Sequence, residues 1–275
     1  MSTALAEKYL RVERLPHIWC RGCGHGIVLG ALVRAMDEVG LDLDRTVVVS
    51  GIGCASRAAG YLNCDGLHTT HGRALAFATG VKLARPELRV IVIAGDGDLA
   101  AIGGNHFIHA ARRNLDLTCI CFNNQVYGMT SGQHSPTSPR LSLAPTAPYG
   151  HLEREFDLCE LARAVGAGYV ARAAAYNPRA MTRLLVRALD LRGFSFVEVL
   201  SQCPTYFGRR NRLGGAVDML KWQKEHTVDV ARAREMDPAE LEGKVVTGEL
   251  HRAEYPEYTA AYAELVSRVK GETGR

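Results

Sequence analysis

Oxygen-bearing side chains follow two apolar runs of the chain. The run Arg89–Ala94 is followed by Gly-Asp-Gly-Asp, which begins with Gly95 and Asp96, and the run Leu117–Phe122 is followed by two asparagines, the second being Asn124. Mg²⁺ binds carboxylate, amide, carbonyl and phosphate oxygens in octahedral geometry. The glycines beside Asp96 let the backbone approach phosphate groups closely. This spacing predicts a diphosphate held through Mg²⁺ by Asp96 and Asn124.

An ordinary turn is the alternative interpretation of each motif. Gly-Asp-Gly often follows a strand as a simple turn, and a pair of asparagines forms turns equally well. Because the two motifs follow successive apolar runs, the metal site is favoured over two unrelated turns. A nicotinamide site is disfavoured, because no Gly-x-Gly-x-x-Gly motif opens a helix after a first strand.

Four of the eight cysteines lie in turn sequences of three distant segments: Cys20, Cys23, Cys54 and Cys203. Four thiolates suit either a [4Fe–4S] cluster or a structural zinc ion. Zinc sites usually draw on two local Cys-x-x-Cys pairs, so ligands from three segments favour the iron–sulfur cluster. The other four lie in a buried apolar run, a turn and a helical segment, and are interpreted as structural: Cys119, Cys121, Cys64 and Cys159.

The apolar runs alternate with segments of helical periodicity. Runs rich in β-branched residues at 46–50, 89–94, 117–122 and 194–200 predict strands buried on both faces of a parallel sheet. Helices are predicted at 26–39, 73–85, 105–114, 157–165 and 178–191. This alternation predicts an α/β fold with a doubly wound, mostly parallel sheet. Such sheets bind ligands beyond the carboxyl ends of their strands, which is where the motifs fall.

Two regions depart from the alternation. The segment Tyr127–Gly150, rich in Gly, Ser, Thr and Pro, is too long for an ordinary connection and is predicted to be a functional loop. Beyond Cys203 the chain becomes polar and helical without a clear strand. We therefore predict an α/β domain over residues 1–205 and a helical C-terminal extension over residues 206–275, which packs on the domain or on a partner.

Composition excludes several classes of protein. Of the 275 residues, 47% are hydrophobic and 23% charged, which is ordinary for a globular protein. A net charge of +4 without a basic run argues against nucleic-acid binding. No stretch approaches the roughly 20 apolar residues of a membrane span, and Met1–Pro16 lacks the apolar core of a signal peptide. A cytoplasmic location is predicted, where cysteines are not expected to form disulfides.

The motifs, taken in order, resemble those of the β chains of 2-oxoacid:ferredoxin oxidoreductases. The resemblance spans most of Pro16–Arg212 and includes WCxGCGHG, GIGC, HTTHGR, GDGD, NNxxYGMT, GQxSPT and QCPTYFGR. It implies the thiamine-diphosphate-binding (PP-type) fold. The implied activity is the coenzyme-A-dependent oxidative decarboxylation of a 2-oxoacid, or the reverse carboxylation, with electrons passing through the [4Fe–4S] cluster to ferredoxin. Residues 202–211 most resemble chains of 2-oxoglutarate enzymes, with pyruvate or a broad range of 2-oxoacids as the alternative.

The resemblance also implies roles for individual residues. Asp96, Asn124 and the backbone carbonyl of Val126 would hold Mg²⁺. Further contacts to thiamine diphosphate would come from three turns and a histidine: Ile52, Gly53, Cys54, Ala55 and Ser56; Gly95, Gly97 and Asp98; Gly128 and Met129; and His71, for which helix capping is the alternative. Arg57 and Ser131 are candidates for binding the substrate's carboxylates, although most arginines lie on solvated surface. His25 and His106 are interpreted as structural, or as supporting the residues that contact the cofactor.

One catalytic group of thiamine enzymes is missing from the sequence. In the family, the glutamate that activates the aminopyrimidine lies in a separate pyrimidine-binding domain, which the resemblance assigns to an α subunit. No catalytic residue is therefore assigned to this chain, and the cofactor is expected at an α–β interface, in an (αβ)₂ assembly or with further γ and δ subunits. Two other hypotheses stay open: a non-redox thiamine-diphosphate decarboxylase or synthase chain with structural zinc, and a non-catalytic scaffold.

Overall fold

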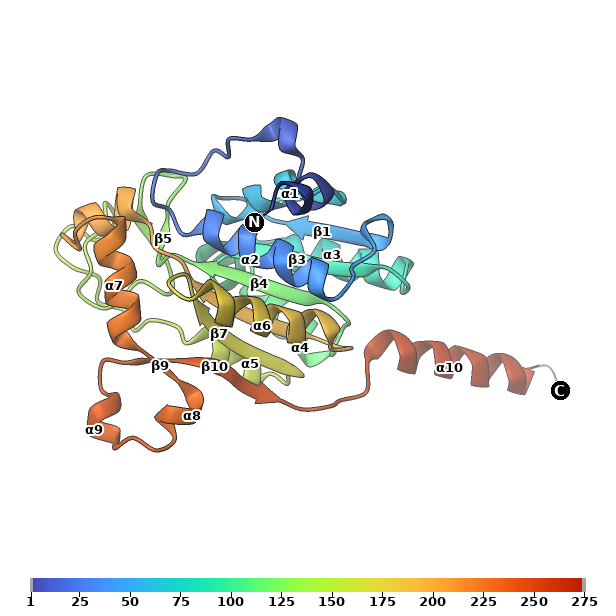
Figure 1. Ribbon diagram of the computed structural model, residues 1–275. Coiled ribbons are helices and arrows are strands. Elements are labelled where there is room, and N and C mark those ends of the chain that lie inside the picture. The colour runs from blue at the N-terminus through green and yellow to red at the C-terminus, as the bar shows by residue number, and fades with distance from the viewer. Residues whose placement is uncertain (1, 274–275) are drawn as a thin grey trace.

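The computed structural model describes residues 2–273 and contains an eight-stranded sheet with helices on both faces (Figure 1). The strand order is β2-β1-β3-β4-β8-β7-β10-β9. Only the β7–β10 pair is antiparallel; all other neighbours run parallel. The strands are β1 (Thr46–Ser50), β2 (Asp65–His68), β3 (Arg89–Gly95), β4 (Thr118–Asn123), β7 (Tyr169–Ala174), β8 (Ser195–Leu200), β9 (Thr227–Asp229) and β10 (Val245–Arg252). The predicted doubly wound, mostly parallel α/β fold is confirmed.

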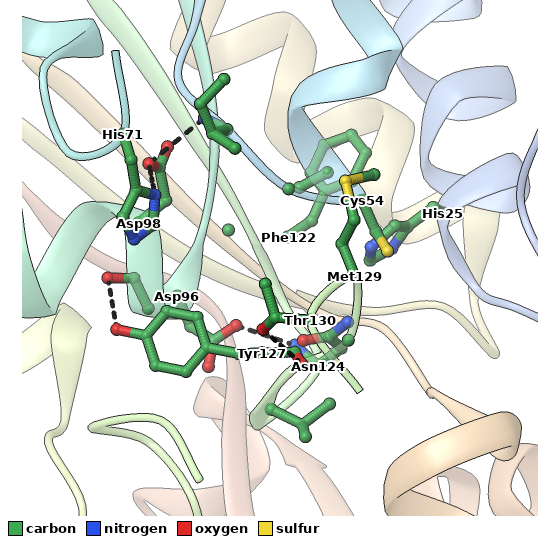
Figure 2. A pocket seen from close by; sticks show the side chains of 17 residues that line it. His25, Cys54, His71, Asp96, Asp98, Phe122, Asn124, Tyr127, Met129 and Thr130 are labelled. Carbon is green, nitrogen blue, oxygen red and sulfur yellow. Dashed lines mark hydrogen bonds and ion pairs between the residues drawn. The ribbon is translucent and has the colours of Figure 1, made fainter. Parts of the chain in front are cut away.

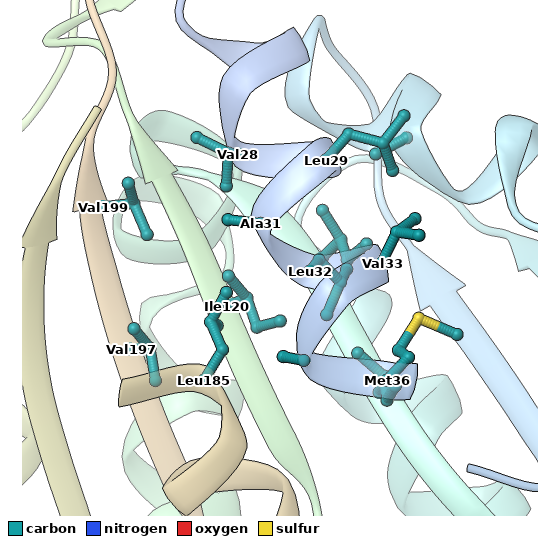
Figure 3. Packing of buried hydrophobic residues seen from close by; sticks show 14 of the residues in the cluster. Val28, Leu29, Ala31, Leu32, Val33, Met36, Ile120, Leu185, Val197 and Val199 are labelled. Carbon is teal, nitrogen blue, oxygen red and sulfur yellow. The ribbon is translucent and has the colours of Figure 1, made fainter. Parts of the chain in front are cut away.

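Each face of the sheet carries its own core. On one face, Ile91 and Ile93 of β3 pack in a cluster with α2 (His25–Glu38) and α6 (Pro178–Asp190). Figure 3 shows this core, with Leu32 of α2 and Leu185 of α6 beside Ile120 of the sheet. Residues of α1 (Thr3–Tyr9) complete it.

The opposite face is covered by three other helices. Val90 and Val92 of β3 pack there with α3 (Ala74–Ala84), α4 (Gly104–Arg112) and α5 (Leu158–Ala164). Successive side chains of a strand point to opposite faces, so a strand covered on both faces is apolar at most positions. This pattern identifies β1, β3, β4 and β8 in the sequence, and all four are confirmed, as are the five predicted helices, to within two residues at each end. The sequence interpretation missed β7, which is equally buried but short and rich in alanine.

The prediction that no strand follows Cys203 is wrong. The segment contains α7 (Ala216–His226), β9, α8 (Val230–Ala233), α9 (Pro238–Leu241), β10 and α10 (Tyr258–Thr273). Strand β10 is only partly buried, and its pairing with β7 shifts register between Glu249 and His251. A polar, irregular strand next to the edge of the sheet lacks the apolar run that identifies a central strand. Helix α10 projects from the body of the molecule (Figure 1).

The division of the chain at residue 205 stays a prediction, and its outermost residues, 1 and 274–275, lie outside the described residues. Within the predicted functional loop, β5 (Val126–Tyr127) and β6 (Gln133–His134) form a small antiparallel pair. Among residues 2–273, no helix combines the length and apolarity that crossing a membrane requires.

Candidate functional site

A pocket lies where β1, β3 and β4 end. These strands are neighbours and run parallel, so the segments that follow them meet at one edge of the sheet. Nearly all predicted cofactor and Mg²⁺ contacts line this pocket: Ile52, Gly53, Cys54, Ala55, His71, Gly95, Asp96, Gly97, Asp98, Asn124, Val126, Gly128 and Met129. Figure 2 shows these side chains arranged around one cavity.

Asp96 is almost fully buried, at 1% exposure, and its two oxygens face different groups. Oδ2 accepts hydrogen bonds from Ser135 Oγ at 2.5 Å and from Thr137 Oγ1 at 2.6 Å. Burial raises the pKa of the Asp96 carboxyl, and the two hydroxyls oppose that rise. Oδ1 stays free of these hydroxyls and faces Asn124. The carboxylate therefore presents one oriented oxygen to the pocket.

The side-chain amide of Asn124 lies between two oxygens. One of its outer atoms is 3.2 Å from Asp96 Oδ1 and 2.8 Å from the carbonyl oxygen of Val126. If this atom is nitrogen, the amide donates to both oxygens. If it is oxygen, three oxygens converge. Two adjacent ligands of an octahedral Mg²⁺, each at 2.0–2.1 Å, lie about 2.9 Å apart. The residues present thus fit the predicted metal.

Asp98 joins the three turns that form the pocket wall. Its Oδ1 lies 2.6 Å from Nδ1 of His71 and accepts the backbone N–H groups of Gly72 at 2.7 Å and Ile52 at 3.3 Å. Burial raises the pKa of the Asp98 carboxyl, while these two N–H groups and His71 oppose the rise. Gly51 is required beside it, because a Cβ there would lie 2.0 Å from Asp98 Oδ2.

Gly97 leaves room for the aromatic ring of Tyr127. A Cβ at Gly97 would lie 2.3 Å from the ring of Tyr127, whose hydroxyl donates to the Gly97 carbonyl at 3.1 Å. Tyr127 itself lines the pocket, so the open space at Gly97 lets an aromatic ring form part of the wall.

The four predicted ligand cysteines come together beside the pocket. Burial raises the pKa of the Cys23 thiol to about 12, and the neighbouring thiols of Cys203, Cys54 and Cys20 add to the rise. A Cβ on Gly128 would lie 3.5 Å from Cys54 Sγ and 3.9 Å from Cys203 Sγ. The three segments predicted to share one site therefore do meet in space.

The four thiols come from three segments that are distant in the sequence, whereas structural zinc usually draws on two local Cys-x-x-Cys pairs. The [4Fe–4S] cluster at this position stays a prediction.

Three predicted contact residues lie off the pocket wall. Ser56 is fully buried, and its hydroxyl has no hydrogen-bond partner in the described part of the chain. Arg57 and Ser131 are exposed and do not line the pocket. Their roles stay predictions. The four cysteines interpreted as structural are all buried and outside the pocket: Cys64, Cys119, Cys121 and Cys159.

The sequence interpretation missed several residues at the site. His25 is fully buried and lines the pocket; its Nδ1 lies 2.7 Å from Ser201 Oγ, and burial lowers its pKa to about 3. Its Nε2 has no hydrogen-bond partner among the described residues. Ser135 and Thr137, which contact Asp96, lie in the motif GQxSPT, but nothing in the sequence connects them with a residue 39 and 41 positions earlier.

Comparisons with known proteins identify the family. Residues 51–199 match the family model described as thiamine pyrophosphate enzyme, C-terminal TPP binding domain. The chain is 58% identical to the 2-oxoglutarate synthase subunit KorB of Methanothermobacter marburgensis, over 96% of this chain and 93% of that protein. It is 52% identical to the KorB subunit of Methanocaldococcus jannaschii, over 97% and 99% of the two chains.

A solved structure is also similar. The 2-oxoglutarate:ferredoxin oxidoreductase from Magnetococcus marinus, with 2-oxoglutarate, coenzyme A and succinyl-CoA bound, aligns with a TM-score of 0.86 at 35% identity, over 96% of this chain and 90% of that chain. The long matched segments agree with the motifs, the sheet topology and the pocket described above. The chain belongs to the β subunits of the 2-oxoacid:ferredoxin oxidoreductases.

Proposed function

We propose that this chain, together with an α subunit, converts 2-oxoglutarate and coenzyme A to succinyl-CoA and CO₂, or catalyses the reverse carboxylation. Electrons pass through a [4Fe–4S] cluster to ferredoxin. The names of the relatives and the ligands of the similar solved structure support 2-oxoglutarate as the substrate. A cytoplasmic location and an (αβ)₂ assembly, or one with γ and δ subunits, stay predictions.

The surroundings of Gly128 support the redox part of the proposal. Its added Cβ would touch Cys54 Sγ at 3.5 Å, the Asn124 side-chain nitrogen at 3.7 Å and Cys203 Sγ at 3.9 Å. A single glycine thus separates two thiols from the amide that faces Asp96. A cluster on these thiols and a metal–diphosphate group on Asn124 would be neighbours, which is what direct electron transfer between them requires.

The residues divide into two sets of ligands. Asp96, Asn124 and the Val126 carbonyl would hold Mg²⁺ through their converging oxygens. The four thiols would hold the cluster: Cys20, Cys23, Cys54 and Cys203. Iron binds thiolates, so cluster assembly removes the protons that burial otherwise keeps on the thiols.

Thiamine diphosphate, when bound, supplies the nucleophile and the electron sink for decarboxylation. The chain's own residues bind and orient it. Asp98 holds His71 and the turns at Ile52 and Gly72 in place around the cavity. The buried Phe122 forms part of the wall and excludes water. Arg57 and Ser131 stay proposed contacts for the substrate's carboxylates.

The α subunit is part of the proposal because of what the pocket lacks. None of the described residues that line it is a glutamate. The group that activates the aminopyrimidine would therefore come from the partner, and the cofactor would lie between the two subunits.

An anaerobic assay of the α–β complex tests the proposed function. We expect reduction of a viologen dye that depends on coenzyme A and is fastest with 2-oxoglutarate among a panel of 2-oxoacids. Iron analysis should give about four iron atoms per chain in the complex. Turnover without any electron acceptor, in a colourless complex that contains zinc, would instead identify a non-redox thiamine enzyme.

A further inference from the structure

Buried polar side chains connect Asp96 with the interior of the sheet, on the side away from the pocket. Thr137 Oγ1 lies 2.6 Å from Asp96 Oδ2 and 2.9 Å from Asn123 Oδ1. Asn123 Nδ2 donates to Glu198 Oε1 at 2.7 Å, and Arg172 Nε donates to Glu198 Oε2 at 2.5 Å. Asn123, Glu198 and Arg172 are at most 8% exposed and do not line the pocket.

The charge of Glu198 determines which way the Asn123 amide points. An ionised carboxylate only accepts hydrogen bonds, so the NH₂ group of Asn123 must face Glu198. The amide oxygen then points away from Glu198 and accepts the backbone N–H of Gln125 at 3.0 Å. Gln125 has a left-handed backbone, with φ of 60°. This hydrogen bond closes the turn that carries Asn124 and the Val126 carbonyl, two of the proposed Mg²⁺ ligands.

The same amide oxygen is also connected to Asp96, the third proposed ligand, through the side chain of Thr137. The hydroxyl of Thr137 is within donating distance of both Asn123 Oδ1 and Asp96 Oδ2, so these two oxygens share its single proton. The orientation of a single buried amide is therefore coupled to all three proposed ligand groups. A reversed amide would present NH₂ to the Gln125 N–H, and two donors cannot bond to each other.

We propose that Glu198, held by Arg172, is a positioning residue for the metal–diphosphate centre. It acts by fixing the orientation of Asn123 and touches neither metal nor cofactor. Glu198 and Arg172 are register partners on the adjacent strands β8 and β7, so the sheet itself sets their geometry. This inference rests on the proposed function, because it requires a metal at Asp96 and Asn124.

The substitution Glu198→Gln tests the coupling. The guanidinium of Arg172 is only a donor, so it pairs with the oxygen of the new glutamine amide. The NH₂ group of that amide then faces Asn123. Asn123 must then turn its own oxygen toward residue 198 and lose the bond to Gln125. With Mn²⁺ as an EPR-visible probe in the purified α–β complex with thiamine diphosphate, we expect the Mn²⁺ Kd to rise about 10- to 100-fold.

A second change should restore binding. In the double variant Glu198→Gln, Asn123→Asp, the new carboxylate accepts from the amide at 198 and from the Gln125 N–H, and it keeps an oxygen beside Thr137. We expect its Mn²⁺ affinity to return most of the way to that of the wild type. Glu160→Gln is the matched control, since it removes an exposed carboxylate that pairs with Arg163, and its Mn²⁺ affinity should stay unchanged.

Thr137 provides an independent variant if Glu198→Gln fails to fold. Thr137→Val keeps the shape and removes the hydroxyl, so it should weaken Mn²⁺ binding, while Thr137→Ser should bind like the wild type. The inference is overturned if Glu198→Gln binds Mn²⁺ as tightly as the wild type, even if its melting temperature falls. Where Glu198→Gln does not fold, the same result in Thr137→Val overturns it. A wild-type complex that binds no Mn²⁺ with thiamine diphosphate would overturn the proposed function as well.

Discussion

The imidazole Nδ1 of His71 lies 2.6 Å from the carboxylate Oδ1 of Asp98, at the wall of the pocket (Figure 2). The contact fixes the ring and turns its other nitrogen away from the carboxylate. Asp98 is 3% exposed, whereas the His71 side chain is about a third exposed. A buried, immobile carboxylate thus orients a histidine that a bound molecule can reach.

Asp98→Asn should impair the complex through His71. The amide keeps the size of the carboxylate but loses its charge. His71 and the N–H groups of Gly72 and Ile52 all face the one oxygen Oδ1, and a neutral amide oxygen there holds them less strongly. If His71 takes part in proton transfer, kcat should fall about 10²-fold or more. The double variant with His71→Asn should be no slower than Asp98→Asn alone, because the two residues act as a unit. Additive losses in steady-state kinetics would show that Asp98 and His71 act independently.

Gly51→Ala should displace the same carboxylate. The new Cβ would lie 2.0 Å from Oδ2 and 2.6 Å from Cγ of Asp98, whose buried side chain has little room to move. We expect weaker binding of thiamine diphosphate to the complex, measured by calorimetry. Gly80→Ala is the matched control: Gly80 lies in α3 with nothing within 4 Å of the added Cβ, so it should raise stability by about 1 kcal/mol and leave binding unchanged. Equal binding by the two variants would contradict the prediction.

His25 should make the chain sensitive to acid. Its pKa is about 3 in the folded chain because of burial, against about 6.5 when unfolded. The unfolded state therefore binds the additional proton as the pH falls below 6.5, and stability falls progressively until about pH 3. Between pH 7 and pH 5 this group should contribute a loss of about 2 kcal/mol.

His25→Gln, which has no titrating group, supplies the comparison for that loss. Urea unfolding of both proteins at pH 7 and pH 5 measures the difference. The variant should lose about 2 kcal/mol less than the wild type on acidification. A parallel loss in the two proteins would mean that His25 does not titrate between the folded and unfolded states as its burial requires.

Gly22→Ala should interfere with the cluster. Gly22 lies between Cys20 and Cys23 with φ of 79°, and an added Cβ would lie 2.4 Å from Cβ of Ala216 in α7. The left-handed backbone alone makes alanine unfavourable by about 1–2 kcal/mol. The clash moves the turn that carries two thiols, so iron content and visible absorbance of the complex should fall.

Gly40→Ala separates the clash from the backbone strain. Gly40 is also left-handed, with φ of 63°, but nothing lies within 4 Å of its added Cβ. This variant should lose stability without losing iron. Iron loss in both variants would point to general destabilisation as the cause.

The sequence reveals most of what lies at the centre of the fold. Strands β3 and β4 are apolar along most of their length because helices cover both faces, and their ends lead to Asp96 and Asn124. The strands at or next to the edges are different. β2 is a short, exposed Asp-Gly-Leu-His segment, and β10 is half-buried and irregular, so neither has an apolar pattern to detect.

The candidate site likewise contains some residues that can be recognised in the sequence and others that cannot. The cysteine and Asp-Asn motifs are recognisable because the metal ligands proposed for them require particular residue types in turns. The contacts of Ser135, Thr137 and Glu198 with that site depend on three-dimensional pairing. Serine, threonine and a strand glutamate have many uses in a protein, so their types and positions carry no signal until the sheet brings them together.

The pairing of β10 with β7 has a consequence for anyone who wishes to shorten or fuse this chain. Arg172 lies on β7, and its Nη1 donates to the Val246 carbonyl of β10 at 3.4 Å, while its Nε holds Glu198. A cut after residue 205 would expose the edge of β7 and remove a contact of this arginine. The residues after position 205 and the proposed metal site should therefore be kept together when the chain is engineered, although the sequence of residues 206–275 suggests a separable extension.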